Sequence, residues 1–239
     1  ATTTAMDNID PTEVAKFESL AARWWDPHSE FRTLHQINPL RLEYIAQRVT
    51  LEGARVVDVG CGGGILSEAL WTRGAQVTGL DAGQAPIAVA KLHAKESGAR
   101  INYQNTTAES LADELPGGFD LVTCMELLEH VPDPAATVTA CAKLLRPGGQ
   151  AFFSTINRNV KSWLLAIVGG EYLLNLLPRG THHYEKLIRP SELDAWARKT
   201  GLQLTEMIGM HYNPVSRSYR LGPGVEVNYI AHFSRPYPA

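Results

Sequence analysis

The chain has 239 residues, of which 44% are hydrophobic and 20% charged, so it has the composition of an ordinary globular protein that can bury a ligand. The net charge of −3 excludes the strongly basic surface typical of nucleic-acid binding, and we expect no nucleic-acid partner. Cys61, Cys124 and Cys141 form no CxxC pair, and their odd number favours a reducing, cytoplasmic setting over a disulfide framework.

The first 52 residues predict a helical extension. Asp10 can cap a helix that continues to Trp25, with Pro11 at its first position and apolar residues at helical spacing. A second helix is predicted to start after Asn38-Pro39 and to run to Arg48.

From Arg55 onward, short apolar runs alternate with helical patterns. The predicted strands are Arg55–Val59, Gln76–Asp81, Ile101–Gln104, Phe119–Cys124, Gln150–Thr155, Gln203–Ile208 and Val227–Phe233. The predicted helices are Ile65–Arg73, Ala85–Ser97, Ala135–Leu145 and Ser191–Thr200. This alternation predicts a single α/β domain over residues 1–239, with a Rossmann-like, doubly wound, mostly parallel seven-stranded sheet. Ligands of such sheets bind beyond the carboxyl ends of the strands.

A glycine-rich loop follows the first of these strands. It contains Gly60, Gly62 and Gly64 in a GxGxG pattern, whereas a strict dinucleotide fingerprint would require glycine or alanine in place of Ile65. Asp58 before the loop suits a ligand that carries positive charge and no phosphate. S-adenosylmethionine (AdoMet) has a sulfonium, an ammonium and no pyrophosphate, so the loop favours AdoMet over an ordinary glycine turn.

Two further residues extend this candidate cofactor site. Asp81 ends the second strand, where a carboxylate can accept hydrogen bonds from both ribose hydroxyls. Met125 follows the fourth strand, where it could pack against the cofactor or simply fill the core. The residues alone do not decide between these two roles of Met125.

The string Met125-Glu-Leu-Leu-Glu-His130 combines two acids and an imidazole. If the chain turns helical after Cys124, Glu126, Glu129 and His130 share one helix face and could hold a divalent cation. Mg²⁺ prefers such oxygen ligands, and Zn²⁺ stays open because of the histidine. A bound cation would lower a phenol pKa from about 10 and orient the oxygen. The alternative is a solvated helix start with favourable acidic residues.

Several strings resemble the ubiquinone-biosynthesis O-methyltransferases. They are Asn38-Pro-Leu-Arg41, Val57-Asp-Val-Gly-Cys-Gly-Gly-Gly-Ile-Leu66, Cys124-Met-Glu-Leu-Leu-Glu-His-Val-Pro-Asp-Pro134, Phe153-Ser-Thr-Ile-Asn-Arg158, Gly180-Thr-His182 and Leu221-Gly-Pro-Gly-Val225. The resemblance implies methylation of a ring hydroxyl on polyprenylated catechols or quinols. It also implies AdoMet contacts at Arg41, Gly60, Asp81 and Met125, and Mg²⁺ at Glu126, Glu129 and His130. One departure is Leu187, where relatives often carry phenylalanine.

An apolar segment lies in a predicted helical insertion over about residues 157–190. Lys161 and Arg179 flank the segment, which is too short and too interrupted to span a bilayer. It could lie in a lipid interface, cover a lipophilic substrate, or pack as core. Together with the resemblance, it predicts an enzyme peripheral to the inner membrane, in possible contact with other ubiquinone-biosynthesis enzymes.

The sequence does not identify a catalytic base. His182, His183, Lys186, His211 and Tyr212 are candidates if no metal activates the substrate, although each taken singly is better read as an ordinary surface or core residue. Three other functions stay open at this point: an AdoMet methyltransferase of another small molecule, an NAD-dependent oxidoreductase, and a non-catalytic lipid-binding protein.

Overall fold

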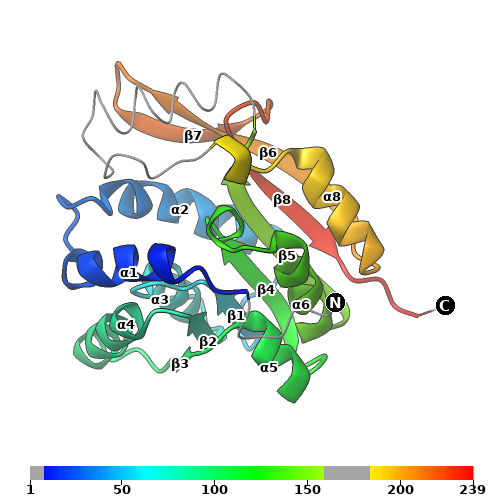
Figure 1. The fold of residues 1–239 in the computed structure, drawn as a ribbon, viewed down its shortest axis with the longest axis horizontal. Helices are drawn as coiled ribbons and strands as arrows, with labels where there is room; N and C mark the ends of the chain where they lie inside the picture. Colours follow the sequence, from blue (N-terminus) through cyan, green and yellow to red (C-terminus); the bar gives the residue numbers. More distant parts are fainter. Residues whose placement is uncertain (1–7, 159–183, 239) are drawn as a thin grey trace.

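The computed structural model describes residues 8–158 and 184–238, and within them eight strands form one mixed sheet in the order β3-β2-β1-β4-β5-β8-β6-β7 (Figure 1). Strands β1 to β5 pair in parallel, whereas β8 pairs antiparallel with both β5 and β6. The strands are β1 (Arg55–Val59), β2 (Gln76–Asp81), β3 (Asn102–Asn105), β4 (Phe119–Met125), β5 (Leu145–Ile156), β6 (Gln203–Asn213), β7 (Ser218–Gly222) and β8 (Asn228–Ser234). The strand order reverses between β1 and β4, which places a ligand crevice beyond their carboxyl ends.

The predicted fold class is confirmed, but the strand count of seven is wrong for the described chain. The additional strand is β7, which pairs with the far half of β6 as a polar hairpin. The prediction ended β6 at Ile208, whereas it continues to Asn213, whose side chain accepts a hydrogen bond from the Val215 amide in the turn. Because most residues of this hairpin are exposed, hydrophobic alternation gave no signal for it.

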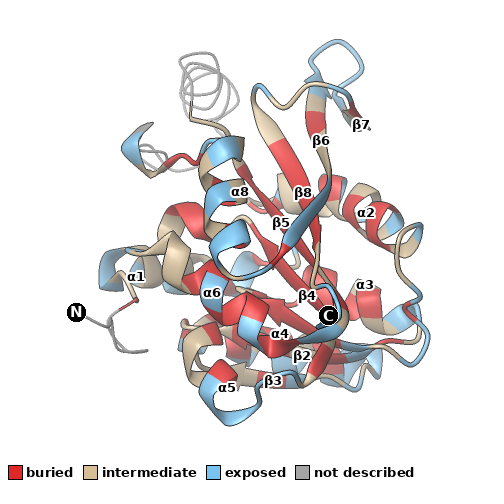
Figure 2. Ribbon diagram, turned by 90° about the vertical axis from the view of Figure 1, so that its right-hand side faces the viewer, coloured by how far each residue is buried: buried red, intermediate tan, exposed pale blue. Residues whose placement is uncertain are grey.

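Helices cover both faces of the sheet. They are α1 (Pro11–Leu20), α2 (Arg32–Ala46), α3 (Ile65–Thr72), α4 (Gln84–Ser97), α5 (Ala108–Glu114), α6 (Pro134–Leu144) and α8 (Pro190–Lys199), with 3-10 turns η1 (Ala21–Arg23), η2 (Leu128–His130) and η4 (Tyr184–Lys186). In Figure 1, α1 to α4 lie on one side of the sheet and α5, α6 and α8 on the other. Successive residues of a strand point to opposite faces, so Val56 packs with the α2–α3 side and Val57 with the α5–α6 side. Figure 2 shows the buried residues concentrated on the central strands.

Helices α2 and α5 differ most from their predictions, and α1 ends at Leu20 rather than at the predicted Trp25. Helix α2 begins at Arg32, before the predicted start, and continues through Pro39, which has no N–H for a helical hydrogen bond. Burial of Ile37, Tyr44 and Ile45 against the sheet offsets that loss, so tertiary packing overrides the proline signal. Helix α5 was not predicted because its seven residues carry too short an apolar pattern.

No helix in the described ranges is long and apolar enough to cross a bilayer. The predicted apolar segment Lys161–Arg179 lies outside the described residues, as do His182 and His183. The division of the chain into an extension over residues 1–52 and an insertion over residues 157–190 therefore stays a prediction.

Candidate functional site

The glycine-rich loop links β1 to α3 at the switch point of the sheet. Gly60, Gly62 and Gly64 have φ angles of 72°, 53° and 92°, in the left-handed region that favours glycine. The amide of Cys61 donates to the Leu80 carbonyl at 2.8 Å, which ties the loop to the end of β2. A Cβ on Gly62 would overlap the ring of Trp24, which lies directly over the loop.

Alanine at Gly62 is therefore expected to destabilise the fold by roughly 1–3 kcal/mol, because it adds left-handed strain and displaces the Trp24 ring. Gly98→Ala is the matched control, since Gly98 has a φ of 78° but no atom within 4 Å of a built Cβ. Urea denaturation of both variants separates strain from overlap. Equal losses would show that the contact with Trp24 contributes nothing.

Asp81, at the end of β2, bonds the glycine-rich loop and the loop that follows β2. Its Oδ2 accepts from the Gly62 amide at 2.9 Å and its Oδ1 from the Gly83 amide at 2.8 Å. Burial raises the pKa of Asp81, and the two amides oppose that rise. No cation pairs with this carboxylate among the residues that the structure describes, so its remaining lone pairs are available to hydroxyl donors such as a ribose diol.

Asp58, which the sequence placed near the ligand, lies beneath the loop instead. Its two oxygens accept from the hydroxyls of Ser67 at 2.7 Å and Thr123 at 2.8 Å, so it links β1 to α3 and β4. Burial is the main cause that raises the pKa of Asp58 to about 6, against an ordinary value of 3.8.

This shift predicts a pH dependence of stability. Between pH 3.8 and about 6 the folded state holds the proton of Asp58 and the unfolded state does not, so stability falls as pH rises through this window. The free energy of unfolding of the wild-type chain should fall by an amount on the order of 3 kcal/mol across this window. Asp58→Asn has no carboxyl to titrate at this position and should not show that fall. Denaturation of both proteins at pH 4 and pH 7 measures it, and identical pH profiles would contradict the shifted pKa.

Arg41 and Glu126 form a buried ion pair at the end of β4. Arg41 Nη2 lies 2.7 Å from Glu126 Oε1 and 3.4 Å from Ser154 Oγ, and the Arg41 side chain is only 5% exposed. Arg41 Nε is buried and has no hydrogen-bond partner within the described chain. An unpartnered donor of a charged group is costly, which makes Nε suited to a ligand carboxylate.

Glu126 and Glu129 are close neighbours whose pKa values shift in opposite directions. Burial would raise the pKa of Glu126, but the Arg41 guanidinium and the hydrogen bonds of Glu129 and Ser154 hold it below its ordinary value. Burial, followed by the charge of Glu126, raises the pKa of Glu129 well above its ordinary value. The Thr155 hydroxyl also donates to Glu129 Oε2 at 2.8 Å. Of the two, Glu126 is the better stabilised anion, and Glu129 is the carboxyl that takes up a proton more readily.

The prediction that Glu126, Glu129 and His130 share one helix face is wrong. Glu126 has a left-handed φ of 54° and precedes the short 3-10 turn η2, so no helical i, i+3, i+4 face forms. His130 Nδ1 bonds Glu13 Oε2 on α1 at 2.8 Å. Over residues 8–158 and 184–238, no group of three His, Cys, Asp or Glu side chains is arranged to hold a metal ion. The three residues as they lie do not fit a resident Mg²⁺ or Zn²⁺.

The remaining predicted residues that the structure describes each have contacts of their own. Met125 packs in the core cluster that contains Met210, at the end of β4. Lys186 pairs with Asp10 and Glu13 at 3.3 Å, and His211 Nε2 bonds the Pro223 carbonyl at 2.8 Å. Tyr212 is 38% exposed on the hairpin. Neither His211 nor Tyr212 lies with the glycine loop.

Sequence reasoning missed the cover of the loop. Besides the Trp24 contact, Trp25 Nε1 donates to the Gly63 carbonyl at 2.8 Å, and Glu18 Oε1 accepts from the Gln84 amide at 3.0 Å. The adjacent tryptophans were a signal, because large aromatic rings at a helix end seldom lack a packing partner. The loop from β3 to α5, where the Thr106 amide donates to the Asp81 carbonyl, was missed with α5.

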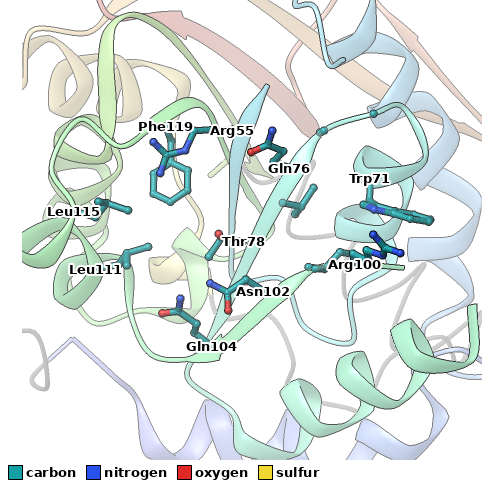
Figure 3. A pocket seen from close by; sticks show the side chains of 14 residues that line it. Arg55, Trp71, Gln76, Thr78, Arg100, Asn102, Gln104, Leu111, Leu115 and Phe119 are labelled. Carbon is teal, nitrogen blue, oxygen red and sulfur yellow. The ribbon is translucent and has the colours of Figure 1, made fainter. Parts of the chain in front are cut away.

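A separate hollow of about 760 Å³ lies on the sheet near the amino ends of β1 and β2 (Figure 3). Polar side chains of β2 and β3, including Thr78 and Asn102, lie between Arg55 with Phe119 on one side and Trp71 with Arg100 on the other. Since ligands of doubly wound sheets bind at the opposite end of the strands, this hollow is not the cofactor site.

Comparison with known proteins places this geometry in a family. A family model described as a methyltransferase domain matches residues 19–207. Relatives named ubiquinone biosynthesis O-methyltransferase include one from Pseudomonas putida, 60% identical over 94% of this chain and 97% of its own. Another, from Pseudomonas aeruginosa, is 57% identical over 96% and 99%.

Solved structures agree on the fold. Magnesium protoporphyrin IX methyltransferase from Synechocystis, with bound SAH, superposes with a TM-score of 0.66 at 20% identity, covering 92% of this chain and 94% of that one. A SAM-dependent methyltransferase from Thermotoga maritima gives a TM-score of 0.67 at 16% identity, covering 92% and 99%. The NAD-dependent oxidoreductase alternative has no support in these likenesses. The chain belongs to the ubiquinone-biosynthesis O-methyltransferase family of AdoMet-dependent enzymes.

Proposed function

We propose that the chain transfers the methyl group of AdoMet to a ring hydroxyl of a polyprenylated catechol or quinol intermediate of ubiquinone biosynthesis. The observation that carries the proposal is the 60% identity to relatives of that name over 94% of the chain. The loop and strand ends described above supply a matching donor site.

We assign the cofactor contacts from the polar groups at that edge. Asp81 accepts hydrogen bonds from the ribose hydroxyls, and Arg41 Nε donates to the amino-acid carboxylate. Gly60 and Gly62 let the backbone approach the ligand closely, and Met125 lies beside them at the end of β4. AdoMet supplies an electrophilic methyl group on a positively charged sulfur.

The acceptor ring then lies on the Glu126–Glu129 side of the crevice. The aryl oxygen forms a bond to the methyl carbon as the carbon–sulfur bond breaks, the bonding pair stays on the sulfur as a neutral thioether, and the hydroxyl proton passes to solvent. The chain contributes position and shielding from water, because Trp24 and Trp25 close the loop from above. Glu126, Glu129 and His130 would not hold Mg²⁺ in this arrangement, because His130 bonds Glu13 on α1 and Glu126 pairs with Arg41.

Two wider parts of the proposal rest on sequence alone. The apolar segment flanked by Lys161 and Arg179 suits a peripheral contact with the inner membrane from the cytoplasmic side. Contact with other ubiquinone-biosynthesis enzymes follows from the same pathway assignment. Co-sedimentation with anionic vesicles tests the first: Leu173→Glu with Leu177→Glu should reduce it, and full retention would remove the interfacial segment.

The decisive assay measures methyl transfer from labelled AdoMet to a short-tailed prenyl catechol and to the corresponding phenol without a second hydroxyl. A thermal-shift control compares stabilisation of the chain by AdoMet and by NAD. We expect methylation of the catechol and stabilisation by AdoMet but not by NAD. Absence of labelled product with every prenyl catechol and quinol tested would overturn the proposal.

A further inference from the structure

A cavity of about 280 Å³ opens beside Glu129, next to the proposed acceptor position. We name it the Glu129 cavity. It is bounded by η2 and the start of α6, by residues 185–188, and by α8. Glu129 connects it to the sheet edge, because the Thr155 hydroxyl at the end of β5 bonds the Glu129 carboxyl. Glu129 therefore lies between the cavity and the end of β5, on the side of the sheet edge where methyl transfer is proposed.

The walls of the Glu129 cavity are mostly apolar. The apolar side chains that line it are Leu128, Val131, Pro132, Pro134, Leu187, Ile188 and Trp196. Leu128, Leu187 and Ile188 are each no more than 2% exposed, which makes the inner wall a rigid part of the core. Such walls favour an uncharged hydrocarbon group.

The cationic side chains at the rim are paired with acidic ones. Arg158 pairs with Glu192, and Lys186 pairs with Asp10 at 3.3 Å. The cations are thus already neutralised, so a phosphate or carboxylate ligand would have to displace an existing pair. The rim therefore selects against an anionic occupant and leaves the apolar interior as the determinant of binding.

The volume sets the length of hydrocarbon that fits. A dry cavity of about 150 Å³ holds benzene, with six carbons. The Glu129 cavity, at about 280 Å³, has room for roughly ten carbons, which is two isoprenoid units.

We infer that the Glu129 cavity binds the first two isoprenoid units of the substrate tail and so selects prenylated over plain catechols. This inference rests on the proposed function and deepens it, because it assigns the apolar part of the substrate to named residues. Val131 is the residue to vary, since it is partly buried in an extended stretch between η2 and α6 and is outside the cofactor contacts.

The test measures kcat/KM for catechols that carry no, one, two or three isoprenoid units. With the wild-type chain, kcat/KM should rise with the first two units and gain less from the third. Val131→Trp, which fills the cavity, should lower kcat/KM for the two-unit substrate at least tenfold and change that of the plain catechol less than twofold. Val215→Trp, at a site 93% exposed, is the matched control and should leave the profile unchanged.

Val131→Ala gives a second variant if the tryptophan fails to fold. It removes apolar contact with the tail equivalent to about two methylene groups. The preference for the two-unit substrate should therefore fall roughly three- to tenfold. An unchanged chain-length profile in the folded variants would overturn the tail site while leaving the methyltransferase assignment intact. Failure of the wild-type chain to methylate any of the four catechols would instead overturn the proposed function.

Discussion

Asp81→Ala is expected to weaken AdoMet binding at least 100-fold. The Asp81 carboxylate has no cation partner in the described chain, and each of its oxygens already accepts one backbone amide. Two hydrogen bonds to a charged acceptor contribute about 1.5–3 kcal/mol each, so losing both corresponds to at least about 3 kcal/mol. Isothermal titration calorimetry with AdoMet measures the change.

The control must separate ligand contact from loop support, because Asp81 also orders Gly62 and Gly83. Asp81→Asn keeps the side-chain shape and one acceptor oxygen, so it should bind with intermediate affinity. Asp120→Ala removes a carboxylate at the opposite end of β4, where Asp120 pairs with Arg146, and should bind AdoMet as the wild-type chain does. Wild-type affinity in Asp81→Ala would refute the ribose assignment.

Arg41→Leu is expected to lower the free energy of unfolding by about 3–5 kcal/mol. The Arg41 side chain is 5% exposed and that of Glu126 20% exposed, so the substitution leaves a largely buried carboxylate without its cation. Urea denaturation monitored by circular dichroism measures this loss. A loss under 1 kcal/mol would mean that the pair contributes little to the fold.

The double variant Arg41→Leu with Glu126→Gln separates stability from ligand binding. Glutamine removes the uncompensated charge and can still accept from the Ser154 hydroxyl, which lies 3.0 Å from Glu126 Oε1, so most of the stability should return. AdoMet affinity should stay low, because Arg41 Nε is absent in both variants. Recovery of both properties together would contradict a direct role of Arg41 in binding the cofactor.

The repeating α/β core was predictable because its central strands β1 and β4 are apolar and mostly buried. The ranges Arg55–Val59 and Gln76–Asp81 were predicted to the residue, and the GxGxG loop lies between them in the expected order of elements. The elements that escaped prediction are short or polar. Helix α5 has seven residues, and the β6–β7 hairpin faces solvent over much of its length, so neither leaves the apolar periodicity on which such predictions depend.

The candidate site was predictable where function depends on residues at strand ends. Gly60, Gly62 and Asp81 lie together as expected, since the carboxyl ends of parallel strands meet at one edge. The arrangement after β4 was not predictable, because the left-handed φ of Glu126 breaks the helical spacing assumed from sequence. Partners that are distant in the sequence were not predictable either, because no local pattern links His130 to Glu13.

A crystal structure of the chain with S-adenosylhomocysteine would locate the cofactor site. We expect ribose hydroxyls at hydrogen-bond distance from Asp81, the amino-acid carboxylate on Arg41 Nε, and the sulfur facing the Glu126–Glu129 side. A nucleoside bound elsewhere, for example in the hollow between Arg55 and Arg100, would contradict this assignment.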